Sequence, residues 1–387
     1  MAVIVLFVIL VITSVLTINK VEYVDEKGNH FVGISAARDL REAKNEWKGY
    51  LTEDTLSKAL EENRTINNSK EALSDDITEQ NKAYAKKQGI VSIIDVISQA
   101  FSEYRDYNYY AADNVSDDEV GAIYERRISA LKEWFDSGEE TFTQEEKDFM
   151  IQKYEDLETP FYYEYMDGWA ALLQNISTFI LILALVIGFF VSGIFSDEFQ
   201  AKADSIFFST RFGRSRGISA KVGAGFCITT GFYVIFVLLY TFIVLFVLGV
   251  DGANCPIQLD LWRSVYNITF LQAYLFIVLG GYIGTIFAST LAMLVSALTR
   301  STPTAIIVPF IVLCAFPFLS RIITLPGLCS FFPDQLLEIY LDIKEAGLVT
   351  LGGKVTTIAT VIVPVYAVIC LILLPVLYKV YKKTEIK

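Results

Sequence analysis

The sequence is poor in the residues that most often carry out chemistry. It contains one histidine, His30, among 387 residues, which excludes a histidine-rich metal site and leaves no spare base for a Ser/His/Asp triad. Its five cysteines include no pair with the spacing of metal ligands or of a redox motif. The segment GLVTLGGKVTT at residues 347–357 departs from a nucleotide-binding loop, because its first glycine is out of register and Val355 replaces the magnesium-binding hydroxyl. We therefore expect no catalytic residue, metal or cofactor in this chain.

Charge is missing from the long apolar runs. None of the six has an Asp, Glu, Lys, Arg or His in its interior; they lie at residues 3–18, 170–194, 222–250, 265–299, 304–319 and 355–377. Carriers driven by a proton or sodium gradient commonly place ionisable groups there. Coupling to an ion gradient is disfavoured, and energy for transport would have to come from outside the chain.

These runs predict an all-α membrane protein with six transmembrane helices. The first run is at the short end of what crosses a hydrocarbon core. A signal peptide is the alternative, although a basic leader and a small-residue cleavage site are missing. The predicted division of the chain is transmembrane helix 1 at 1–18, an inserted domain at 19–168, helix 2 at 169–194, a basic loop at 195–221, helices 3 to 5 at 222–324, outer short helices at 325–354, helix 6 at 355–378 and a basic tail at 379–387.

Charge is divided unevenly between these parts. Residues 19–168 hold 34 acidic and 18 basic residues, whereas the rest of the chain holds 10 acidic and 14 basic residues. An acidic soluble domain is therefore inserted into a membrane protein, and its acidity argues against binding nucleic acid. Because short loops rich in Lys and Arg stay in the cytoplasm, the basic loop predicts cytoplasmic termini and an extracellular inserted domain. Apolar residues of the domain recur at helical spacing, and Thr143 with Glu146 has the pattern of a helix capping box, so we expect a helical bundle there.

The order of these segments resembles the permease subunit of ABC-2-type transporters, especially bacterial members with a large extracellular domain between the first two spans. The loop FSDEF…STRFGRSRGISAK carries the resemblance, with Glu198 after the second span and GRSR…K before the third. The resemblance implies residence in the bacterial plasma membrane, a second permease chain as a homodimer or heterodimer, surrounding membrane lipid, and cytoplasmic ABC ATPase subunits that bind ATP and Mg.

The resemblance further implies that the basic loop includes a coupling helix that docks on the ATPase. Charged groups could form hydrogen bonds at the rim of an apolar face made of Phe195, Phe199, Ile206 and Phe207. The alternative is that the arginines only hold the loop against anionic lipid. The candidate contact residues are Phe195, Glu198, Phe199, Arg211, Arg214, Arg216 and Lys221.

Two further patterns concern packing. Small residues recur every four positions in the fourth span and predict a ridge for close packing of another helix, within the chain rather than between chains; they are Gly280, Gly284, Ala288, Ala292 and Ser296. Cys255 and Cys329 both fall in predicted outer loops, where a disulfide is chemically allowed and separate free thiols are the simpler interpretation.

The favoured function is an ATP-driven export permease that moves an amphiphilic substrate such as an antimicrobial peptide, a lipid or a drug. The alternative is a non-transporting membrane receptor or assembly protein whose helical domain binds a ligand or partner. A membrane-embedded enzyme fits least well, because the spans lack ionisable groups.

Overall fold

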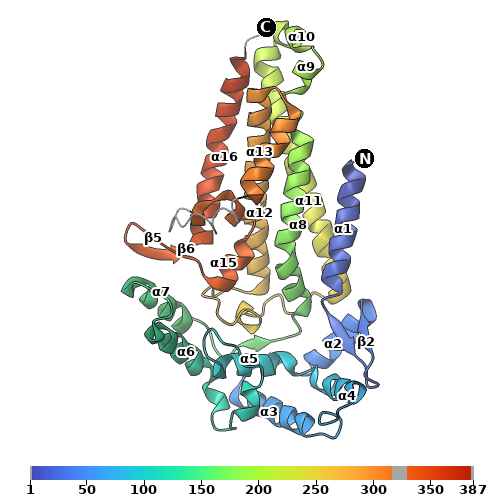
Figure 1. Cartoon of the computed structure of the whole chain (residues 1–387), viewed down its shortest axis with the longest axis vertical. Coiled ribbons are helices and arrows are strands. Elements are labelled where there is room, and N and C mark those ends of the chain that lie inside the picture. Colours follow the sequence, from blue (N-terminus) through green and yellow to red (C-terminus); the bar gives the residue numbers. More distant parts are fainter. Residues whose placement is uncertain (1, 316–328, 385–387) are drawn as a thin grey trace.

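A computed structural model describes residues 2–315 and 329–384 of the chain. They form two parts stacked along the long axis, a bundle of long helices and a smaller domain at one end of it (Figure 1). We call this smaller part the helical domain. The C-terminal end of the described chain and the loop between α8 and α11 lie at the opposite end of the bundle.

The bundle is built from apolar helices. Among the described residues, four helices are long and apolar enough to cross a membrane, and two apolar helices are shorter. The four are α8 (Asp167–Val191), α11 (Ile218–Leu248), α12 (Phe270–Thr299) and α16 (Ile358–Lys382); the shorter two are α1 (Ala2–Ile18) and α13 (Thr302–Cys314). The prediction of six spans therefore depends on α1 and α13. The expected continuation of the fifth span to residue 319 lies outside the described residues.

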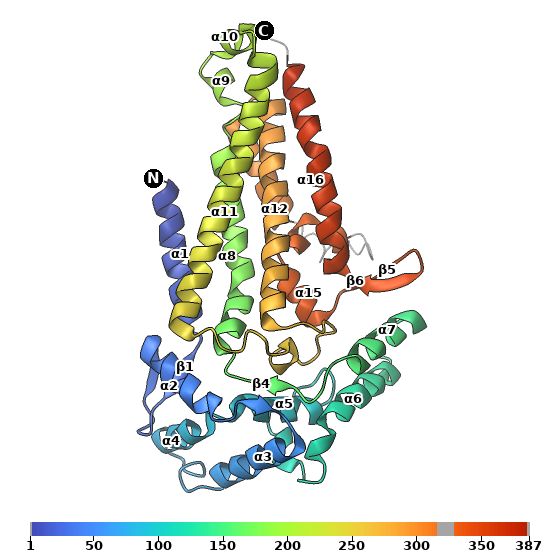
Figure 2. The same ribbon diagram turned by 180° about the vertical axis from the view of Figure 1, so that it is seen from behind.

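Helix α12 lies at the centre of the bundle. It contacts α8, α11, α13 and α16, and its position between α11 and α16 is visible in Figure 2. The predicted small-residue ridge is buried along its whole length, as expected for packing within the chain. At the domain end, however, the ridge packs against the short segment at residues 333–345 and not against a spanning helix. A Cβ on Gly280 would lie 1.8 Å from Ile339 Cδ1, and one on Gly284 would lie 2.9 Å from Leu337 Cδ2. The absence of side chains at these two positions lets those residues pack against the α12 backbone.

The helical domain consists of short helices and two small sheets. Its elements are β1 (Glu22–Val24), β2 (His30–Val32), α2 (Ile34–Asn45), β3 (Gly49–Tyr50), α3 (Glu53–Asn67), α4 (Ile77–Lys87), α5 (Val91–Phe101), η1 (Ala111–Asn114), η2 (Val120–Ala122), α6 (Ile123–Ser137), α7 (Gln144–Glu155) and β4 (Tyr162–Tyr163). Strands β3 and β4 pair antiparallel, Gly49 with Tyr163, which places the segment after α2 beside the end of the domain that leads into α8. The predicted capping box of Thr143 and Glu146 is present at the start of α7.

Charged residues of α2 and the segment after it fasten the helical domain to the bundle. Lys44 pairs with Asp167 at the start of α8 at 2.6 Å, and Arg41 pairs with Asp251 after α11 at 2.7 Å. Lys48 also pairs with Glu164. Because the Lys44 and Asp167 side chains are only 6% and 19% exposed, their attraction is less screened than that of a surface pair.

The connection between α11 and α12, residues 249–269, is a second attachment. It includes η4 (Ile257–Leu259) and lies against α6 and α7. Arg127 of α6 donates hydrogen bonds to the carbonyl oxygens of Trp262 and Ser264 at 3.1 and 2.9 Å. Tyr154 of α7 donates to the carbonyl oxygen of Arg263 at 2.9 Å. The helical domain is therefore held both by its covalent connections and by this loop.

The segment before α16 corrects one prediction. It contains the expected short helices, η5 (Cys329–Phe331), η6 (Pro333–Leu336) and α15 (Ile339–Glu345), but continues as a hairpin of β5 (Leu348–Leu351) and β6 (Lys354–Thr357). Gly352 and Gly353 between the strands both have positive φ, +58° and +80°. Adjacent residues with positive φ suit a two-residue hairpin turn, and β-branched residues flank them, which favours strands over a helix.

Candidate functional site

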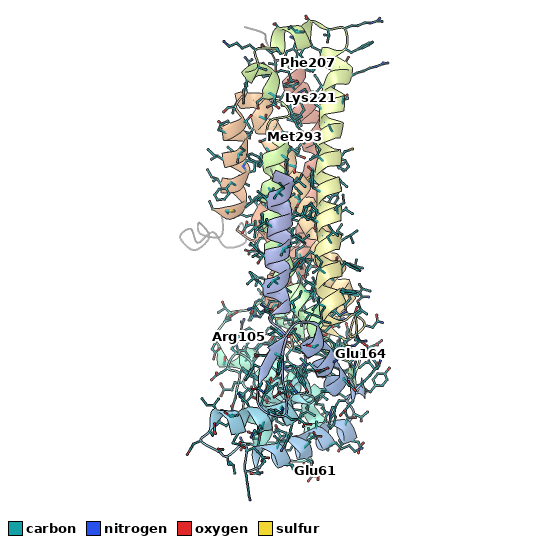
Figure 3. All side chains as sticks on the ribbon, turned by 90° about the vertical axis from the view of Figure 1, so that its right-hand side faces the viewer. Glu61, Arg105, Glu164, Phe207, Lys221 and Met293 are labelled. Atoms are coloured by element: carbon teal, nitrogen blue, oxygen red, sulfur yellow. The ribbon has the colours of Figure 1, made fainter. Side chains whose placement is uncertain are left out.

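The loop between α8 and α11 folds into three short turns at the end of the bundle away from the helical domain. They are α9 (Asp197–Gln200), α10 (Asp204–Ser209) and a π-helical turn, η3 (Gly213–Gly217). Ser196 and Gln200 each form a 2.7 Å hydrogen bond with the hydroxyl of Thr302, at the start of α13. The predicted basic loop is thus a folded cap on the bundle. In Figure 3, Phe207 and Lys221 lie at this end and Glu61 at the other.

An aromatic cluster anchors the cap. The Phe195 side chain is fully buried and meets the Tyr381 ring edge-on at 4.7 Å between ring centroids. Phe208 packs against the same tyrosine at 5.2 Å, and the half-buried Phe199 ring contacts both Phe208 and Tyr381. Phe195 therefore stabilises its own chain and is not an exposed contact, which corrects its predicted role.

Glu198 and Lys221 form an ion pair inside this cap. Their side chains are 21% and 17% exposed and their charged atoms are 2.5 Å apart. The Lys221 ammonium also donates to the carbonyl oxygen of Ile194, and Tyr381 donates to Glu198 at 3.3 Å. Hydrogen bonds to charged groups are the strong ones. These two predicted contact residues join α9, α11 and the end of α16 to one another.

Arg214 also bonds within the chain. Its guanidinium donates to the carbonyl oxygens of Lys382 and Thr384 at 2.9 and 3.0 Å and stacks 4.7 Å from the centre of the Phe208 ring. It ties the cap to the end of α16, where these carbonyls have no partner within the helix. We therefore regard Arg214 as a positioning residue of the cap.

Four other side chains of the cap are exposed and combine apolar groups with positive charge. Arg211 and Arg216 are exposed, and both guanidinium groups lie over the Phe212 ring, 5.2 and 4.8 Å from its centre. Phe212 itself is 46% exposed, and Ile206 is 69% exposed. We name Ile206, Arg211, Phe212 and Arg216 the cap face. It combines apolar area with two cations, a composition typical of contact surfaces in proteins.

The sequence pattern did not identify two parts of this site. Tyr381, at the end of α16, is the residue around which the cap packs. It lies in the predicted basic tail, where only the lysines were used to predict a location. Phe212 stands out only once the structure shows which aromatic side chains of the loop remain exposed, whereas Ile206 was already expected on the apolar face of the loop. Of the predicted contact residues, the structure places Arg211 and Arg216 on the outer surface.

An apolar cavity of about 580 Å³ lies between α1, α8, α12 and α13. Its lining includes Val5, Phe189, Ala288 and Phe310. Such a cavity suits aliphatic or aromatic groups rather than charged ones. In the same helices many apolar side chains face outward, among them Ile4, Leu16 and Ile307, as expected of surfaces in contact with lipid acyl chains.

The other predicted site concerns cysteine. Cys255 is a fully buried free thiol, and burial raises its pKa to about 12. The Cys329 side chain lies outside the described residues, so its disulfide with Cys255 stays a prediction. Among the residues that the structure describes, no group of three or more His, Cys, Asp or Glu side chains has the arrangement of a metal site.

Comparison with known proteins gives one family. A family model described as ABC-2 family transporter protein matches residues 1–339. No curated protein and no solved structure matches the chain.

Proposed function

The chain belongs to the ABC-2 family of transporter proteins, and from this premise we propose that it is the permease subunit of an ATP-driven exporter. The cap between α8 and α11 contacts a separate cytoplasmic ATPase, which binds ATP and Mg and drives the helices of two permease chains. A second copy or a related permease completes the pathway. The observation that carries the proposal is the cap face, an exposed surface of two arginines and two apolar side chains on an otherwise well-anchored cap.

The charge distribution supports a cytoplasmic location for the cap. The basic loop and the basic end of α16 lie at the same end of the bundle, joined by Arg214, whereas the acidic helical domain lies at the other end (Figure 1). Because Lys and Arg near helix ends resist translocation, we infer that the cap faces the cytoplasm and the helical domain faces outward. The membrane is then the bacterial plasma membrane.

Charge reversal on the cap face tests the ATPase contact. The protein is purified from native membranes in wild-type and Arg211→Glu/Arg216→Glu forms, and the co-purified nucleotide-binding subunit is identified and its ATP hydrolysis measured. We expect the double variant to lose the subunit and the hydrolysis while its melting temperature stays unchanged, because neither guanidinium forms a hydrogen bond or ion pair with another described residue. Arg214→Glu should instead lower the melting temperature, since it breaks two bonds to α16.

Lys383→Glu is the matched control. Lys383 is exposed at the same end of the bundle, so reversing its charge changes the local potential without altering the cap face. Retention of the ATPase by the double variant, or equal loss with Lys383→Glu, would contradict the proposed contact.

Cysteine labelling tests the orientation. Single cysteines replace Ser205 in the cap and Asp118 in the helical domain, both exposed positions, in a cysteine-free background. A membrane-impermeant maleimide applied to intact cells should label position 118 and leave position 205 unlabelled until the membrane is permeabilised. Labelling of position 205 from outside would overturn both the orientation and the ATPase contact.

The cargo is proposed to be amphiphilic, as an antimicrobial peptide, a lipid or a drug is. The apolar cavity between α1, α8, α12 and α13 supports this class, because it offers room for an apolar group within the bundle. The competing function is a membrane receptor or assembly protein, favoured by the size and firm attachment of the helical domain. Stable isolation from native membranes without any nucleotide-binding subunit would support that competitor.

A further inference from the structure

A cavity of about 650 Å³ lies where the helical domain meets the bundle. It is lined by residues of α2, α4 and α5 from the domain, by the start of α8, by residues 258–262 of the α11–α12 connection, and by α15. We name it the junction cavity. Its volume is within the range of cavities that hold drug-sized ligands.

The charges that line the junction cavity are only partly neutralised. Asp167 is paired with Lys44, and Glu22 Oε1 lies 2.9 Å from His30 Nδ1. Asp95 accepts one hydrogen bond, from the Tyr107 hydroxyl at 3.0 Å.

Asp260 is the least satisfied of these acids. Among the described residues, none forms an ion pair or a side-chain hydrogen bond with its carboxylate. Lys44 and Lys344, which line the same cavity as Lys20, act on Asp260 through the longer-range field without pairing with it. Two carboxylates, Asp95 and Asp260, are thus left without a cationic partner.

Aromatic rings accompany these carboxylates. Tyr84, Tyr107 and Tyr340 line the cavity from three different segments; Tyr84 and Tyr107 are 42% and 43% exposed. The negative charges of Asp95 and Asp260 are close enough to act on Tyr84 and Tyr340 respectively. Aromatic faces attract cations, so the rings and the carboxylates favour the same kind of ligand.

A buried amide gives an independent indication of a ligand. Gln258 lines the cavity with a fully buried side chain, and its Nε2 donates to the carbonyl oxygens of Tyr266 and Ser264 at 2.8 and 3.4 Å. These two bonds fix the amide orientation, since Nε2 and not Oε1 can donate. Its Oε1 has no hydrogen-bond partner in the described part of the chain. A buried acceptor without a partner is costly, and a ligand N–H group would satisfy it.

We propose that the junction cavity binds an amphiphilic organic cation that carries an N–H group, such as a primary ammonium attached to an aromatic or aliphatic body. Asp95 and Asp260 take its charge, the tyrosine rings hold its body, and Gln258 Oε1 accepts its N–H. The acidic helical domain raises the concentration of cations around the cavity. That this cation is the transported cargo rests on the proposed transport function, whereas the binding itself does not.

Protonation should oppose binding. The Asp260 side chain is exposed to the cavity, and the protein that surrounds the cavity raises its pKa to about 6, with Asp167 and Asp95 adding to the shift and Lys44 and Lys344 opposing it. Burial also raises the pKa of Asp95, against the opposing effect of the Tyr107 hydrogen bond and of Lys44 and Lys87. Below pH 6 the cavity loses negative charge and attracts a cation less strongly.

The test uses the full chain in lipid nanodiscs without ATP or an ATPase. The probe is dansylcadaverine, an aromatic body with a primary ammonium, and its matched control is the dansyl N-pentyl amide, which lacks the ammonium. Binding is followed by dansyl fluorescence, with the signal of empty nanodiscs subtracted. We expect saturable binding of dansylcadaverine, binding about tenfold weaker for the control compound, and a loss of affinity between pH 7.5 and pH 5.

Isosteric variants locate the binding site. Asp260→Asn and Asp95→Asn should each weaken dansylcadaverine binding about tenfold, the size of one charge-assisted contact worth roughly 1.4 kcal/mol. Neither should change binding of the uncharged compound. Asp118→Asn, on an exposed part of the same domain, should leave both affinities unchanged, and melting curves confirm that each variant is folded.

The proposal is overturned if both compounds bind equally, if binding does not saturate, or if the Asp95 and Asp260 variants together leave the affinity intact. These outcomes are distinct from failure of the transport function. Failure of the transport function would appear instead as the absence of a co-purified nucleotide-binding subunit. That experiment concerns the cap, at the other end of the bundle.

Discussion

Arg127 should have a larger effect on the attachment of the helical domain than any surface charge. Its side chain is 2% exposed, and its guanidinium lies 3.6 Å from the centre of the Tyr154 ring while donating to the carbonyl oxygens of Trp262 and Ser264. No described carboxylate pairs with it, so the carbonyl dipoles and the ring must stabilise the charge. We expect Arg127→Ala to free the α11–α12 connection from α6.

The magnitude follows from those contacts. A hydrogen bond to a charged group contributes about 1.5–3 kcal/mol. Ser264 would retain one bond to its carbonyl oxygen, from Gln258 at 3.4 Å, whereas the carbonyl oxygen of Trp262 would lose its side-chain partner. With the stacking on Tyr154 also lost, Arg127→Ala should cost about 3–4 kcal/mol of local stability. Arg127→Lys keeps the charge but not the fork of donors, and should cost about half as much.

Hydrogen exchange measured by mass spectrometry in nanodiscs checks this value. The amides of Leu261 and Ser264 donate to carbonyl oxygens within the connection, at 2.7 and 2.9 Å, and report on its opening. A loss of 3–4 kcal/mol corresponds to exchange that is about 100 to 1,000 times faster for these amides. Arg126→Ala is the control, because the adjacent Arg126 is 38% exposed and makes only a 3.3 Å surface pair with Glu133. Equal protection in the Arg127 and Arg126 variants would refute the reasoning.

Three further outcomes are expected. Gly280→Val should lower the melting temperature by the equivalent of about 1–3 kcal/mol, because its Cβ meets Ile339, whereas Gly188→Ala, with open space at the Cβ, should change it little. Asp260→Asn should raise the melting temperature at pH 7, where the raised pKa disfavours folding with a charged carboxylate; the advantage should shrink below pH 6 and vanish below about pH 3, where the wild-type group is protonated in both the folded and the unfolded state. Cys255 should resist alkylation in the folded protein and react on unfolding, as followed by mass spectrometry; rapid labelling under native conditions would contradict its burial.

The spans and the position of the cap could be predicted from the sequence because both depend on contiguous residues. An apolar run long enough to cross a bilayer is visible in the chain, and so is a basic segment between two such runs. The capping box at Thr143 is equally local. The β5–β6 hairpin is also a local feature, since Gly352 and Gly353 lie between two segments rich in β-branched residues. The prediction of short helices for residues 325–354 overlooked this pattern.

The orientation of individual side chains in the cap could not be predicted in this way. Phe195 and Phe212 are both aromatic residues of one basic loop, yet Phe195 is buried against Tyr381, which lies 186 positions further along the chain, while Phe212 is exposed. Only tertiary packing decides between them. The junction cavity is harder still, because Asp95 and Asp260 come from segments that are adjacent only in the folded protein.

The closeness of its two covalent links makes the helical domain a detachable module. Lys20, which follows α1, and Asp167, at the start of α8, line the same cavity, so the whole segment could be exchanged for that of a relative without changing the path of α1 or α8. Such a chimaera would keep the cap at the far end of the bundle and acquire a different domain at the ends of the helices. The hydrogen bonds from Arg127 show that the exchanged domain must also supply a side chain that binds the α11–α12 connection.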